Sequence, residues 1–215
     1  MAEKNDEAAA WANCKNAAGA AVKFSNGFLG LRKNGSDTAK LGDTDVQRFL
    51  DLVRAISWVE SKHGTGAGEK PKVDPMQCGN PGDVWWKELT GQLTTMDRFV
   101  RGPGLGNLDA DDLPAAAAAT TGFEPKADLK KLGTDVKKGH NATGFAVEHS
   151  YYWAVPILIH KTNKAAGDKT YQCSDLARSR LIAGAVSYNG GGDGNYQTKI
   201  EHALDLFGGL PVLIA

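Results

Sequence analysis

The chain has 215 residues, and its 25 Lys and Arg residues balance 25 Asp and Glu residues. This length suits one sizeable domain, and zero formal charge argues against a protein that binds nucleic acid or an anionic membrane mainly through charge. A hydrophobic fraction of 41% against 23% charged residues indicates an ordinary folded protein rather than a disordered chain.

Neither a membrane span nor an export signal is visible in the sequence. No segment approaches the roughly 20 uninterrupted apolar residues that a membrane helix needs. The start, MAEKNDEAAA, has acidic residues where a secretory signal has a basic stretch and an apolar core. We therefore expect synthesis in the cytoplasm without a signal peptide, while export by another route and excision from a longer protein stay open.

The first predicted elements are helices. The Ala-rich run 7–22 predicts a short helix, followed by a loop to about Gly35. Thr44 and Gln47 have the spacing of a capping box, so a second helix should begin there and stop at Gly64. Its apolar stripe, with the three- and four-residue spacing of a helix face, consists of Val46, Phe49, Leu50, Val53, Ile56 and Ser57. Glu60 extends this stripe.

The middle of the chain is less regular. A Gly- and Lys-rich loop at 63–72 precedes a predicted turn from Asp74 to Gly79, and Asn80-Pro81 predicts the start of a helix reaching Val100. Residues 102–144 look like a long irregular insertion. Residues 145–158 are dense in aromatic and aliphatic side chains, so we expect them to be buried.

Two helices are predicted near the end of the chain. One is capped by Ser174 or Asp175 and ends at Asn189, before three glycines. The other runs from about Asn195 to Phe207. Because strand-like alternation is nearly absent, we expect a mainly α fold in one domain over 1–215, with an N-terminal helix and loop at 1–42 and a core at 43–215.

Glu60 is the residue with the clearest chemical signal. A carboxyl group at the end of an apolar helix face should lie against the core, where desolvation disfavours its charged form and raises its pKa. It would then be a proton donor near neutral pH, as the general acid of glycosidic cleavage must be. A helix-end carboxylate turned to solvent is the alternative.

Three short motifs follow one another along the chain. They are Glu60-Ser61, Asp74-Pro75-Met76-Gln77, and Ser187-Tyr188-Asn189-Gly190-Gly191 followed by Asn195-Tyr196, with Val147–Trp153 between the second and third. In this order they resemble the lytic transglycosylase and goose-type lysozyme superfamily, in which a catalytic Glu ends a helix opposite a Gly-Leu-Met-Gln turn and an Ala-Tyr-Asn-Gly segment closes the cleft. Here Asp74-Pro75 replaces Gly-Leu, and Ser187 replaces Ala.

The resemblance implies a lysozyme-like domain that cleaves the β-1,4 bond between N-acetylmuramic acid and N-acetylglucosamine, with Glu60 as general acid and no cofactor. If a carboxylate positions a water, the glycosidic bond is hydrolysed; otherwise the muramyl 6-hydroxyl attacks and gives an anhydro product. Asp74 and Asp83 are the candidates for that carboxylate, with Glu69 a weaker one. Asp74 has an Asp-Pro turn as its alternative role, and Asp83 a place at a helix N-terminus.

The resemblance also implies substrate-binding residues, and each has a local alternative. Met76 and Gln77 would line the wall opposite the acid, or pack the turn. Tyr188 would approach Glu60, or fill the core. Asn189 has helix capping as its alternative, and Ser61 a local hydrogen bond. We expect Tyr196 to pack rather than to contact substrate.

The overall pattern looks most like the wall-degrading domains of bacterial type VI secretion effectors. That likeness implies an antibacterial toxin that acts in the periplasm or on the wall of a target bacterium. Its partners would be peptidoglycan glycan strands, a secretion apparatus and an immunity protein.

Two other classes of function compete with this reading. A peptidoglycan amidase would use Cys78 near a helix start, with His140, His149 or His160 as base. Cys78 has a buried thiol or a disulfide with Cys173 as its alternatives. A glycan-binding module without activity is the other class. The spacing of His and Cys matches no zinc site, and we expect no metal.

Overall fold

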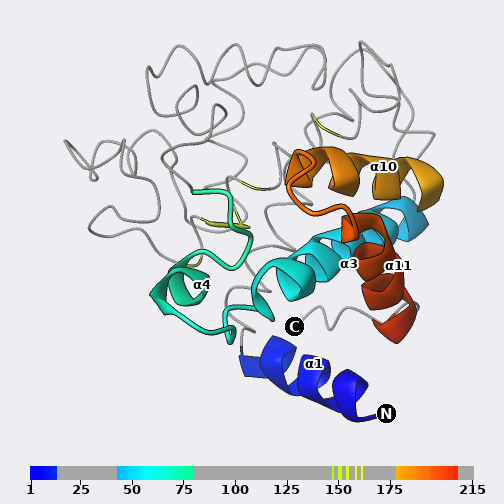
Figure 1. The fold of residues 1–215 in the computed structure, drawn as a ribbon. Coiled ribbons are helices and arrows are strands. Elements are labelled where there is room, and N and C mark those ends of the chain that lie inside the picture. Colours follow the sequence, from blue (N-terminus) through cyan, green and yellow to red (C-terminus); the bar gives the residue numbers. More distant parts are fainter. Residues whose placement is uncertain are drawn as a thin grey trace, which may run out of the picture.

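The computed structural model describes residues 1–13, 43–79 and 178–207, together with positions 147, 150, 151, 154, 158 and 161. These residues form α1 (Ala2–Asn13), α3 (Asp43–Ser61), α4 (Glu69–Val73), α10 (Arg178–Asn189) and α11 (Tyr196–Phe207), and the isolated positions are helical too (Figure 1). No strand occurs in this part of the chain. The prediction of a mainly α fold is confirmed for it.

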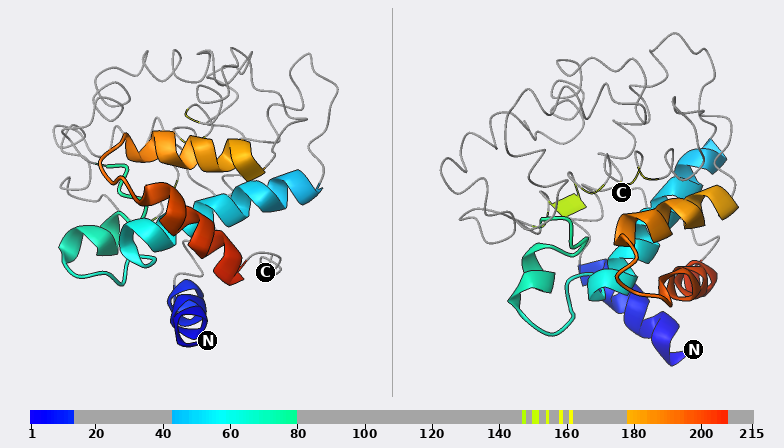
Figure 2. Two further views of the ribbon diagram at one scale, coloured as in Figure 1. Left: turned by 45° about the vertical axis from the view of Figure 1, so that its right-hand side comes forward. Right: turned by 45° about the horizontal axis from the view of Figure 1, so that its top comes forward.

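Helix α3 is the centre of the arrangement. It packs against α10, α11 and α4, while α11 also contacts α1. Figure 2 shows α10 lying along α3 and α11 crossing it, with α1 on the side of α3 away from α10. The candidate acid Glu60 therefore lies at the end of the helix that most of the other described helices contact.

The burial of α3 goes beyond the predicted stripe. Leu50, Val53, Ile56 and Ser57 are buried as predicted, while nothing is described of the side chains of Val46 and Phe49. Several residues off the stripe are buried as well, namely Leu52, Arg54, Ala55 and Trp58. An amphipathic pattern predicts one buried face, but α3 is covered by helices on several sides.

The two C-terminal helices end as predicted, while the predicted caps Ser174 and Asp175 of the first lie outside the described residues. Helix α10 ends at Asn189, and Gly190 and Gly191 leave it with φ angles of 69° and 85° that favour glycine. Helix α11 buries Ile200, Leu204 and Phe207, as its periodicity indicates. Among positions 145–158, the described Ser150, Tyr151, Ala154 and Leu158 are buried too.

Two local expectations differ from the structure. Helix α1 begins at Ala2 rather than Glu7, and its predicted continuation over 14–22 lies outside the described residues. The predicted loop at 63–72 contains the short helix α4. Its Pro71 is the third residue, where the backbone N–H needs no helical partner, so the ring is tolerated.

The predicted helix after Asn80 and the insertion at 102–144 also lie outside the described residues. Within the described part, no helix is long and apolar enough to cross a bilayer.

Candidate functional site

Glu60 lies half-buried in the last turn of α3 and faces the first residue of α11. The hydroxyl of Tyr196 donates a hydrogen bond to Oε1 of Glu60 at 2.6 Å. Burial raises the pKa of Glu60, and although the bond from Tyr196 opposes this, the negative charges of Asp74 and Asp193 add to it. The net rise has the direction expected from the place of Glu60 at the end of an apolar stripe.

The raised pKa makes a prediction about stability that does not depend on function. Because the folded state binds the Glu60 proton more tightly than the unfolded chain, the wild type loses stability as the pH rises from about 4 through the raised pKa. Glu60→Gln should therefore be more stable than the wild type at pH 7 and similar to it at pH 4. Each pH unit of pKa rise corresponds to about 1.4 kcal/mol. Urea unfolding at both pH values measures this, and equal stabilities at pH 7 would contradict it.

Tyr196 is a site residue that sequence reasoning missed. It is buried, as expected for packing, but its hydroxyl is directed at Glu60. Burial raises the pKa of Tyr196, and the negative charge of Glu60 raises it further, so the phenol stays a hydrogen-bond donor. The Asn195-Tyr196 pair in the third motif was the available signal, whereas helical periodicity indicated only an inward side chain.

The carboxylate of Asp74 is fully buried and engaged within its own turn. Its Oδ2 accepts a hydrogen bond from the N–H of Gly79 at 2.8 Å. Its Oδ1 accepts from the N–H of Cys78 at 3.2 Å and from Ser150 Oγ at 2.5 Å. This geometry supports the turn-forming role of Asp74. The negative charge of Asp74 nevertheless raises the pKa of Glu60.

The second and third motifs meet at Met76. The side chain of Met76 is fully buried, and its carbonyl oxygen accepts a hydrogen bond at 2.8 Å from the hydroxyl of Tyr188, which lies 112 residues further along the chain. Gln77 has a φ of 51°, and its side-chain amide donates to the carbonyl oxygen of Asp74 at 2.6 Å. Gln77 thus braces the turn, while Tyr188 joins the turn to α10.

Burial raises the pKa of Tyr188 well above its ordinary value, and the negative charge of Glu60 adds to this. The effect of Glu60 places the two residues in one electrostatic neighbourhood. Hydrogen bonds join the three motifs: Tyr196 to Glu60, Ser61 to the carbonyl oxygen of Pro75, and Tyr188 to that of Met76.

Ser61 and Asn189 make local hydrogen bonds. Ser61 Oγ donates to the carbonyl oxygen of Pro75 at 2.8 Å and lies 3.1 Å from that of Ser57, so it links α3 to the turn. Oδ1 of Asn189 accepts from the N–H of Asp193 at 2.9 Å, in agreement with its capping role. Of the other proposed carboxylates, Asp83 and the side chain of Glu69 lie outside the described residues.

Asp193 is a second residue that sequence reasoning did not select. Its carboxylate pairs with Nζ of Lys199 at 2.5 Å and accepts from the N–H of Asn195 at 2.9 Å, and these bonds lower its pKa. Its side chain is 32% exposed. Asp193 is therefore a negative charge in the electrostatic surroundings of Glu60 that solvent can reach, unlike the buried Asp74.

Cys78 has the properties of a packed thiol. It is buried and free, and its Sγ donates to the carbonyl oxygen of Ser150 at 3.1 Å. Burial raises the pKa of the thiol well above its ordinary value, and the charge of Asp74 adds to this. A nucleophilic cysteine needs the opposite, a lowered pKa and access to substrate. Cys173 lies outside the described residues.

The part of the chain that the structure describes shows no metal site, and one of its pockets lies away from Glu60. No group of three or more His, Cys, Asp or Glu side chains within the described ranges is placed to hold a metal ion. A pocket of about 390 Å³ is lined by Arg48, Asp51, Leu52, Arg178, Leu181, Leu204 and Asp205. Its closest α3 residue in sequence, Leu52, precedes Glu60 by eight residues, or about 12 Å along the helix axis. The pocket and the Glu60 site are therefore separate.

Comparison with known proteins adds no family to this geometry, because no family model, no curated protein and no solved structure matches the chain. The described residues define a helical protein in which a half-buried carboxyl group, two tyrosines and a braced turn come together.

Proposed function

We propose that the protein cleaves the glycan strands of peptidoglycan as a lysozyme-like muramidase, with Glu60 as the general acid. The observation that carries this proposal is the half-buried carboxyl group of Glu60, whose pKa is raised and which Tyr196 holds at 2.6 Å. A carboxylic acid that keeps its proton near neutral pH is what cleavage of a glycosidic bond requires.

In this mechanism Glu60 donates its proton to the oxygen that bridges two sugars. The bond from that oxygen to the anomeric carbon then breaks, and the carbon develops oxocarbenium character. The hydroxyl of Tyr196 orients the acid and stabilises the carboxylate left after proton transfer, because it donates to Oε1. The bond to Tyr188 and the bracing by Gln77 hold the Met76 turn in one conformation.

The second step decides the product. Water that attacks the anomeric carbon completes hydrolysis, whereas the muramyl 6-hydroxyl gives a 1,6-anhydro product. Both oxygens of Asp74 are engaged in the turn, so water positioning by Asp74 would cost these bonds. This observation favours a lytic transglycosylase as the second candidate function, while Asp193 is a partly exposed carboxylate that a hydrolase could use.

We propose that the enzyme is an antibacterial effector that reaches the cell wall of a target bacterium by secretion, with an immunity protein as partner. The resemblance of its ordered motifs to type VI effector domains supports this. To test for an immunity partner, a periplasm-directed form of the protein is co-expressed with the product of each gene that neighbours its own. Toxicity that no neighbouring gene relieves would count against such a partner.

The identity of the reaction is tested by mass spectrometry of the muropeptides released from purified sacculi. Reducing-end muramic products would establish a hydrolase, and anhydro products a lytic transglycosylase. The Glu60→Gln protein serves as the control and should release neither. Free peptide stems that persist in this control would instead point to the Cys78 amidase, and no release by the wild type would leave a binding module.

The neighbours of Glu60 predict opposite shifts of the pH profile. A general acid must be protonated, so cleavage falls as the pH rises through the pKa of Glu60. Tyr196→Phe removes a bond that lowers this pKa, so the fall should move to higher pH. Asp193→Asn removes a charge that raises it, so the fall should move to lower pH. Cleavage rates measured between pH 4 and about 9 locate this decrease, because the pKa values of buried carboxyl groups fall in that range. Shifts in the same direction would contradict the assignment.

A further inference from the structure

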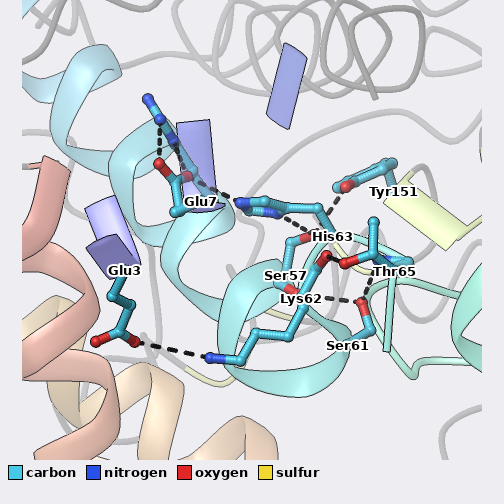
Figure 3. A network of polar contacts seen from close by, with 10 residues as sticks. Glu3, Glu7, Ser57, Ser61, Lys62, His63, Thr65 and Tyr151 are labelled. Atoms are coloured by element: carbon cyan, nitrogen blue, oxygen red, sulfur yellow. Dashed lines mark hydrogen bonds and ion pairs between the residues drawn. The ribbon is translucent and has the colours of Figure 1, made fainter. Parts of the chain in front are cut away.

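A buried chain of polar side chains joins α1 to the end of α3 (Figure 3). Arg54 donates to both oxygens of Glu7, from Nε and Nη2, at 2.6 Å each. Oε1 of Glu7 also lies 2.9 Å from Nε2 of His63. On the other side of the ring, Nδ1 of His63 lies 2.9 Å from Oγ of Ser57, which lies 2.8 Å from the hydroxyl of Tyr151.

The charges in this chain select one pattern of donors and acceptors. Burial lowers the pKa of His63, so the ring is neutral near pH 7. Burial acts to raise the pKa of Glu7, but the hydrogen bonds from His63 and Arg54 outweigh it and the pKa is lowered, so Glu7 is a carboxylate. The Nε2–H of His63 therefore donates to Glu7, and Nδ1 accepts from the hydroxyl of Ser57.

Ser, His and Glu are also the residue types of a nucleophilic triad, but this set has no access to substrate. Ser57 and Glu7 are 0% exposed, and His63 is 1% exposed. A nucleophile must reach the atom that it attacks. Buried in this way, the three side chains can act on a site only by holding other residues in place.

The turn that follows Glu60 is strained. Lys62 and His63 have φ angles of 53° and 55°, a region that residues other than glycine rarely adopt. The hydrogen bonds to both ring nitrogens hold His63 in this conformation. Its ring also contacts those of Trp11 and Trp58, at centroid distances of 4.7 and 5.3 Å. The strain persists because contacts from α1 and α3 together fix the imidazole.

The same turn also sets the wall opposite the acid. Oγ of Ser61 donates to the carbonyl oxygen of Pro75 and accepts from the N–H of Gly64, both at 2.8 Å. Pro75 directly precedes Met76. The backbone from Glu60 to Gly64 is thus tied to the turn that contains Met76.

We propose that Glu7 and His63 are positioning residues for Glu60, which act on its carboxyl group only through the turn that follows α3. This proposal rests on the proposed function. Without Glu7, Arg54 and His63 lose their buried acceptor and the strained turn relaxes. A displacement of about 1 Å at a reacting group can reduce a rate on the order of 100-fold.

Helix α1 offers a matched control in Glu3, one turn before Glu7. Glu3 also contacts the turn after Glu60, with Oε1 3.8 Å from Nζ of Lys62, and its Oε2 lies 2.9 Å from His202. Its side chain is 45% exposed, so this contact is a surface ion pair. Glu7→Gln and Glu3→Gln make the same chemical change, one in the buried chain and one outside it.

The experiment measures kcat and KM on soluble glycan strands, at a temperature where circular dichroism shows each variant folded. For Glu7→Gln we expect kcat to fall about 10- to 100-fold with KM changed less than about twofold. Glu3→Gln should match the wild type. His63→Asn is the second variant, because Asn tolerates a positive φ but does not span from Ser57 to Glu7; it should lose kcat as Glu7→Gln does. Unchanged kcat in both folded variants would overturn the proposal.

Titration of the Glu60 carboxyl carbon by NMR separates this proposal from the proposed function. Glu7→Gln should move the midpoint of the Glu60 titration by about half a pH unit or more. The reason is that the burial of Glu60 and its distance to Tyr196 change. Glu3→Gln should leave the midpoint in place. If the wild type cleaves no glycan but this shift occurs, the proposed function is wrong and the positioning of Glu60 stands. An unmoved midpoint overturns the positioning whatever the activity.

Discussion

Glu60→Gln should lower the rate of glycan-strand cleavage by about 100- to 10,000-fold, the usual contribution of a positioned general acid. Gln has nearly the shape of Glu, and its side-chain oxygen can still accept the bond from Tyr196. The substitution therefore removes the titrating proton and little else. The measurement is the initial rate of release of soluble products from purified sacculi at the pH optimum of the wild type.

The matched control is Glu201→Gln on α11. The carboxylate of Glu201 contacts Gln197 one turn earlier on the same helix, and the substitution makes the same change away from Glu60. It should cleave at the wild-type rate. A folded Glu60→Gln protein that keeps more than about a tenth of the wild-type rate would contradict the assignment of Glu60 as general acid. The loss of rate would then be smaller than the removal of a general acid causes.

Glu7→Ala should destabilise the protein by about 3–5 kcal/mol, because it leaves the buried Arg54 and His63 without their shared acceptor. Arg54 is 5% exposed, so water does not readily replace the lost carboxylate. For a chain of this length each kcal/mol lowers the melting temperature by about 2–4 °C. Urea unfolding followed by circular dichroism measures the free energy of unfolding.

Two variants make this prediction specific. Glu3→Ala removes an exposed ion pair on the same helix and should change the free energy of unfolding by less than about 1 kcal/mol. The double variant Glu7→Leu with Arg54→Met replaces the buried pair by apolar side chains and should be more stable than Glu7→Ala alone. If Glu7→Ala and Glu3→Ala lower the free energy of unfolding equally, the buried hydrogen-bonded side chains do not hold α1 to α3.

Local patterns account for the parts of the fold that could be predicted. The stripe from Leu50 to Ser57 predicted the buried face of α3, and the glycines after Asn189 predicted where α10 ends. The position of Glu60 at the end of that stripe predicted the direction of its pKa. Each of these inferences uses residues within about one to four turns of a helix, over which side-chain direction follows from the helical repeat.

The sequence by itself therefore predicted α3, α10 and α11, a buried face on each, and Glu60 as the candidate acid. The tertiary structure alone decided what surrounds it. Tyr196 bonds to Glu60 across 136 residues, Ser150 to Asp74 across 76, and Glu7 to His63 across 56. Helical periodicity says which face of a helix is buried but not which distant polar group meets it there. Such partners are selected when the helices pack, because a buried polar group must find a hydrogen bond within the folded chain.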